Sequence, residues 1–210
     1  MKRVITFICV ITVMFIAITG CRRSPDFDDL SYEFIVSTSQ DKTANFASYK
    51  KYFISDTIVY IGGVGSDSIM VGPEAAQLVN AVKSNLAARG YTFVSREGGP
   101  DLGLALTAIK DIDVVIESYP GWWGGYYPYC YWYYWCYGYY YPWTTVYSYT
   151  TGTVILDMYD LKNANTDHQL KAIWNTTALG ALGSSTSANI TQGVEAINQG
   201  FEQSPYVKTN

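Results

Sequence analysis

Residues 102–110 read Leu-Gly-Leu-Ala-Leu-Thr-Ala-Ile-Lys, so leucine alternates with small residues along the first half of the segment. A period of two is typical of a β-strand that packs one face on a core. Two later segments repeat this period. Their apolar positions are Val154, Leu156 and Met158 in the first segment, and Leu170, Ala172 and Trp174 in the second. We expect three strands, each with these side chains on one face.

Shorter strand-like runs come earlier in the chain, at residues 34–36, 52–54 and 91–94. They are rich in the aromatic and β-branched residues that favour strands. Residues 62–72 carry four glycines and two serines and are expected to form a loop. No Lys-Ser/Thr pair follows these glycines, so we reject a phosphate-binding loop.

Two helices are expected. The first has Pro73 in its first turn and Gly90 just past its end, which is the usual placement of these residues. Its apolar face carries Leu78, Val79, Val82 and Leu86, and that of the last helix carries Ile190, Val194, Ile197 and Phe201. Together the elements predict an α+β fold, in which two helices pack on a mostly antiparallel sheet.

An aromatic insertion occupies residues 119–149, where 18 of 31 positions are Tyr or Trp. No charged side chain occurs from Ser118 through Leu156. Glycines and prolines punctuate the segment and would break a helix, so it is neither a transmembrane nor an amphipathic helix. We expect a long hairpin extension or loop.

Tyrosine and tryptophan rings offer apolar faces with polar tips, which suit membrane interfaces, peptides or sugar rings. The candidate contact residues are Trp122, Trp123, Tyr131, Trp132, Trp135 and Trp143. An equally simple interpretation is a loop that covers the sheet and binds nothing. Cys130 and Cys136 form a candidate disulfide, although spacing alone says nothing about its geometry.

The amino terminus carries Lys2 and Arg3, then a largely apolar run at 4–18, and ends in Ile18-Thr19-Gly20-Cys21. The run is short for a membrane-spanning helix and has the length of a signal-peptide core. Small residues before a cysteine resemble the lipobox of bacterial lipoproteins. We therefore predict a signal peptide at 1–20 and acylation of Cys21, for example with palmitate.

Two alternatives are an ordinary secretory signal and an uncleaved anchor. The lipoprotein interpretation predicts a lipidated tether at 21–31 and one domain at 32–206. Arg22, rather than aspartate, follows the cysteine, which under the sorting rules of enteric bacteria directs a lipoprotein to the outer membrane. Whether the domain lies on the periplasmic or the surface side is left open.

The composition and the absence of known motifs argue against several classes of function. Of 14 basic and 18 acidic residues, Lys2 and Arg3 leave with the signal, so the mature chain has 12 basic residues and a net charge of −6. This argues against nucleic acid as a partner. The single histidine, His168, lies in a polar turn, and no Gly-x-Ser-x-Gly motif occurs. Cys130 and Cys136 lack the Cys-x-x-Cys spacing of redox motifs.

Pairs of carboxylates are the remaining candidates for catalysis. Asp157 and Asp160 are three residues apart on a strand and should lie on opposite faces. Asp111 and Asp113 share a face but mark the solvated end of a strand. We therefore expect no enzyme, no cofactor and no metal site.

Five short motifs are distributed along the chain, namely Phe46–Phe53, Ala87–Tyr91, Gly99–Leu102, Gly152–Asp157 and Ile173–Asn175. Together they resemble the domain-of-unknown-function family 4136 of envelope lipoproteins, over roughly residues 32–205. The family typically has arginine or lysine where this chain has Asn175. The resemblance implies an α+β fold and an envelope lipoprotein, and it supplies no established activity.

The sequence thus predicts a membrane-anchored, non-enzymatic binding or structural module that uses the aromatic insertion as its contact surface. An envelope protein is expected as partner before a glycan. The alternative is a ligand-binding or enzymatic domain whose cleft the sequence does not reveal.

Overall fold

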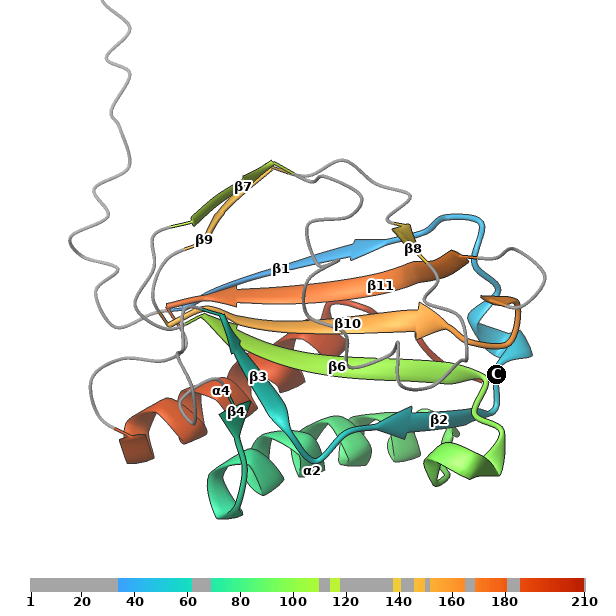
Figure 1. Cartoon of the computed structure of the whole chain (residues 1–210), viewed down its shortest axis with the longest axis horizontal. Coiled ribbons are helices and arrows are strands. Elements are labelled where there is room, and N and C mark those ends of the chain that lie inside the picture. The colour runs from blue at the N-terminus through green and yellow to red at the C-terminus, as the bar shows by residue number, and fades with distance from the viewer. Residues whose placement is uncertain are drawn as a thin grey trace, which may run out of the picture. The chain divides into compact units, whose positions relative to one another are not determined.

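The computed structural model describes residues 34–61, 69–109, 114–117, 138–140, 146–149, 152–164, 169–180 and 186–209 (Figure 1). Six strands form the main path of the sheet, in the order β1-β11-β10-β6-β2-β5. Their bounds are β1 Ile35–Gln40, β11 Gln169–Leu179, β10 Val154–Asp160, β6 Leu102–Ile109, β2 Lys51–Ile54 and β5 Thr92–Phe93.

Three short strands complete this nine-stranded sheet. They are β3 Ile58–Ile61 beside β6, β4 Ile69–Met70 beside β3, and β8 Gly138–Tyr140 beside β11. A separate antiparallel pair consists of β7 Val114–Glu117 and β9 Val146–Tyr149. Residues 62–72 were expected to be a loop, and this is wrong for Ile69 and Met70, because β4 pairs through them with β3.

The strand directions make the sheet mixed. The long ladders among β1, β11, β10 and β6 are antiparallel, which confirms the mostly antiparallel prediction. Both β2 and β3 run parallel to β6, and β8 runs parallel to β11. Parallel neighbours need a crossover connection. Helix α2, Pro73–Ala88, provides it between β2 or β3 and β6.

Helices α2 and α4, Thr186–Glu202, pack on one face of the sheet (Figure 1). The leucines at the even positions of β6 lie in this core, as do the apolar faces predicted for both helices. Two 3-10 turns, η2 Phe46–Ser48 and η4 Arg96–Gly98, precede β2 and β6. Within the described ranges, no helix is long and apolar enough to cross a membrane.

The prediction that Leu170, Ala172 and Trp174 share one face of β11 is wrong, because the strand contains a β-bulge. Met158 is opposite Trp174, but the next residue, Tyr159, is opposite Ala172. The extra residue turns the side chains of β11 over at this point. Trp174 therefore joins the core under the helices, whereas Ala172 and Leu170 belong to a second apolar cluster around Tyr159.

Trp174 anchors α4 on the sheet. Its Nε1–H donates a hydrogen bond of 2.8 Å to the Ser204 hydroxyl just beyond the helix. Its ring lies 4.9 Å from the ring of Phe201, centroid to centroid. Beside Phe201, Gly200 lets the helix backbone approach Thr176, because a Cβ at Gly200 would clash with Thr176 Oγ1.

This close approach predicts that Gly200→Ala destabilises the domain. Alanine favours a helix by about 1 kcal/mol over glycine, but overpacking a core typically costs about 1–3 kcal/mol. We expect a net loss of about 1 kcal/mol in the free energy of unfolding, measured by urea denaturation. In a Thr176→Ala background the same change should cost less, and an equal cost in both backgrounds would contradict the contact.

Candidate functional site

Most of the predicted site residues lie outside the described ranges. These are the lipidation site, the cysteine pair, the aromatic contact residues, the histidine and one pair of aspartates. By residue they are Cys21, Cys130, Cys136, Trp122, Trp123, Tyr131, Trp132, Trp135, Trp143, His168, Asp111 and Asp113. Asp157 and Asp160 are described, and each is the centre of a polar network.

Asp160 is buried at the end of β10, where the chain turns. One carboxylate oxygen accepts the Asn163 backbone N–H at 3.0 Å, and the other accepts the Asn163 side-chain amide at 2.6 Å. The Tyr49 hydroxyl donates to the second oxygen at 2.8 Å. The network therefore ties the segment after η2 to the end of the central strand.

The chemistry open to Tyr49 follows from this burial. Loss of solvent is the largest effect that raises the pKa of its phenol, and the negative charge of Asp160 raises it further. The hydroxyl therefore stays protonated at physiological pH. It can donate a hydrogen bond, but it does not supply a phenolate base or nucleophile.

A second network stands at the same end of the sheet, where β1 stops. Asp41 accepts the Thr43 N–H at 2.8 Å and the Thr43 hydroxyl at 2.7 Å, and it forms an ion pair with Lys171 of β11. Burial alone would raise the pKa of Asp41. The Lys171 ammonium and the two Thr43 donors outweigh burial and hold the pKa below 3.8.

Asp157 belongs to a third network, in the middle of the sheet. Its Oδ1 accepts the Asn175 amide at 2.6 Å, and Asn175 Oδ1 accepts the Thr177 hydroxyl at 3.1 Å. All three residues are buried. Asp157 and Asp160 thus have separate hydrogen-bond partners, as expected of carboxylates on opposite faces of a strand.

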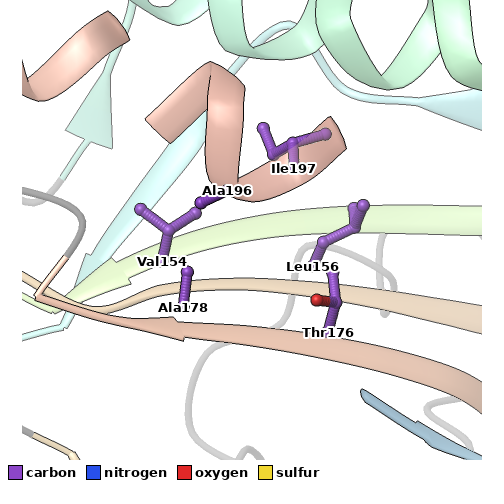
Figure 2. A pocket seen from close by; sticks show the side chains of 6 residues that line it. All are labelled: Val154, Leu156, Thr176, Ala178, Ala196 and Ile197. Atoms are coloured by element: carbon purple, nitrogen blue, oxygen red, sulfur yellow. The ribbon is translucent and has the colours of Figure 1, made fainter. Parts of the chain in front are cut away.

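A small cavity lies between α4 and the strands β10 and β11 (Figure 2). It offers about 10 Å³ to the centre of a water-sized sphere, which is roughly the room that one water needs. Its lining is apolar except for Thr176, whose buried hydroxyl has no hydrogen-bond partner among the described residues. In the described part of the chain, no group of three or more His, Cys, Asp or Glu side chains could hold a metal ion.

Comparison with known proteins identifies the class of domain that this fold represents. The family model named "Domain of unknown function (DUF4136)" matches residues 36–206. The chain therefore belongs to the DUF4136 family, which confirms the resemblance inferred from its motifs.

The solved structures include a DUF4136 family protein from Bacteroides thetaiotaomicron VPI-5482. It is 31% identical, with a TM-score of 0.72 over 84% of this chain and 98% of that one. A PelC dodecamer from Paraburkholderia phytofirmans also matches, with 9% identity and a TM-score of 0.36 over 84% of this chain and 99% of that one. No curated protein matches the chain.

Sequence reasoning missed the two networks at the end of the sheet. A local signal was available, since an aspartate followed two or three residues later by threonine or asparagine is typical of a turn closed by the carboxylate. Asp41 with Thr43, and Asp160 with Asn163, fit that spacing. Tyr49 carried no such signal, because its partner is far away in the sequence.

The Asp41 network predicts a pH-dependent contribution to stability. Because the folded-state pKa of Asp41 lies below its ordinary value of 3.8, its carboxylate stabilises the fold above that pH. The stabilisation is lost as the pH falls through the lower, folded-state value. Asp41→Asn should therefore cost about 1–2 kcal/mol at pH 7, and the difference from wild type should shrink below about pH 4.

Urea denaturation at pH 7 and pH 3 measures this difference. Asp56→Asn, at an exposed carboxylate, is the matched control and should change stability little at either pH. A loss for Asp41→Asn that stays constant from pH 7 to pH 3 would rule out an ionic role for Asp41.

Proposed function

We propose that this protein is an envelope lipoprotein, held in the membrane by acyl chains on Cys21, and that it acts as a non-enzymatic binding or structural module. The observation that carries the proposal is the run from Lys2 to Cys21. It combines a basic start, an apolar segment of signal-peptide length and two small residues before the cysteine. Two or more acyl chains give the stable anchoring that one chain does not.

The outer membrane is the proposed location. Arg22 follows the cysteine, and aspartate at this position is what retains lipoproteins in the inner membrane of enteric bacteria.

The aromatic insertion is the proposed contact surface, and an envelope protein or glycan is its proposed partner. Two described pieces of the insertion have fixed backbone partners, since β8 pairs with Gln169–Lys171 of β11 and β9 pairs with β7. Tyrosine and tryptophan give large contact area at a low cost in side-chain entropy.

Acylation of Cys21 is tested by substitution in the native host. Cys21→Ala should abolish incorporation of an alkyne-labelled palmitate and leave the chain soluble or unprocessed after cell fractionation. Cys9→Ala, inside the signal peptide, is the matched control and should label as wild type does. Equal membrane retention and labelling of the Cys21 variant would refute the anchor.

The contact surface is tested without deleting β8. A full-length variant replaces five tryptophans of the insertion by serine, namely Trp122, Trp123, Trp132, Trp135 and Trp143. Trp174 is then the remaining tryptophan, and its buried-type emission shows whether the domain is folded. Cross-linked envelopes should yield fewer partners with this variant, whereas an unchanged set of partners from the folded variant would remove the insertion from the proposal.

A further inference from the structure

A short irregular segment follows α4 and contacts parts of the fold that are far apart in the sequence. We name residues 204–209 the latch, and they form neither helix nor strand. The latch lies near the carboxyl end that is marked in Figure 1. Ser204, Val207 and Thr209 are buried, whereas the side chains between them are half-buried or exposed. Three buried side chains therefore anchor the latch.

The first anchor, Ser204, joins the latch to β11. Its hydroxyl oxygen accepts the Trp174 Nε1–H at 2.8 Å and the Tyr206 hydroxyl at 3.2 Å. The ring of Tyr206 lies 5.5 Å from the ring of Phe46 in η2, centroid to centroid. The first half of the latch thus connects the sheet to η2.

The second anchor, Val207, is completely buried in the core that the helices share with the sheet. Inside the latch, the Val207 N–H donates to the Ser204 carbonyl at 3.1 Å, and the Lys208 N–H donates to the Tyr206 carbonyl at 2.9 Å. These are turn bonds between near neighbours in the sequence. They shape the latch, but they do not hold it on the domain.

The third anchor, Thr209, joins the latch to the end of α2. Its N–H donates to the Arg89 carbonyl at 3.1 Å, and its own carbonyl accepts the Lys50 ammonium at 3.2 Å. Gly90, the next residue after Arg89, has a φ of 86°, and a Cβ at this position would clash with the Thr209 hydroxyl. Glycine at position 90 therefore leaves the space that Thr209 occupies.

The docking site of the latch exists only when the rest of the domain is in place. Trp174, Arg89 and Lys50 precede their latch partners by 30, 120 and 159 residues. The ladders of β10 and the backbone of α2 have hydrogen bonds of their own. Contacts between residues so far apart in the sequence carry a loop-closure cost, which other contacts must offset first. The latch is therefore expected to dock on a preassembled surface.

We propose that the latch is a conformational device, which docks after the sheet and the helices have formed and is released before they unfold. The domain then has a latched state and an open state. In the open state, Trp174 loses its hydrogen-bond acceptor and the core around Val207 meets solvent, while the antiparallel ladders persist. Local opening of this kind is typical of segments with few buried contacts.

Folding kinetics test the order of docking. The full-length chain is purified in a nonionic detergent, and its refolding and unfolding in urea are followed by stopped-flow circular dichroism. Val207→Ala should raise the unfolding rate on the order of tenfold and change the refolding rate by less than about twofold, because contacts that form after the transition state affect unfolding alone.

Val82→Ala is the matched control. Val82 lies in α2, is as completely buried as Val207 and belongs to the same core, so the substitution removes the same two methyl groups. The control should slow refolding by more than Val207→Ala does, because α2 forms earlier than the latch. If Val207→Ala slows refolding as much as Val82→Ala does, the latch docks together with the helices and the proposal fails.

Hydrogen exchange of the wild-type chain tests the open state without any substitution. The amides of Val207 and Thr209 should exchange with one common protection factor, on the order of tenfold or more below that of Ile109, whose N–H donates to Thr153 within the sheet. Equal protection of all three amides would show that the latch opens only when the domain unfolds. Fast exchange at Thr209 with full protection at Val207 would show fraying of the chain end. Either result would overturn the proposal.

Discussion

The position of one indole ring organises this domain. Trp174 lies under α4, donates to Ser204 and packs on Phe201. Arg89, at the end of α2, lies 4.9 Å from the centroid of the same phenylalanine ring and donates to the Phe201 carbonyl at 2.9 Å. A cation at the carboxyl terminus of a helix donates to a backbone carbonyl that has no partner within the helix. It also interacts favourably with the negative end of the helix dipole. The sheet and both helices are therefore joined through one column of side chains.

Two buried carboxylates stand at one end of the sheet. Asp41 and Asp160 stand where strands stop, and each turns its carboxylate inward to close a turn and hold another segment. Buried carboxylates need such donors, because an unpaired charge in the interior is costly. As a result, these two carboxylates hold together segments that are far apart in the sequence.

Much of the fold was predictable because local periodicity reflects burial. The alternation in β6 and the apolar faces of α2 and α4 correspond to the observed core. The orientation of Trp174 was not predictable, because a β-bulge depends on how two distant strands pair. The hydrophobic period of the sequence does not show where a bulge occurs. Parallel pairing of β2 with β6 was missed for a related reason: a strand pattern carries no direction. The aspartate turns had a local signal, but the contact of Tyr49 with Asp160 did not, because the two residues are far apart in the sequence.

The sequence by itself determined the class of fold, the family and the lipobox-like run that ends at Cys21, since each depends on neighbouring residues or short motifs. Only the tertiary structure decided which face Trp174 occupies, which carboxylates are buried, and which distant side chains those carboxylates bind. The reason is physical. Hydrophobic periodicity records whether a residue is buried, whereas hydrogen bonds such as those of Asp101 decide which distant segments lie together.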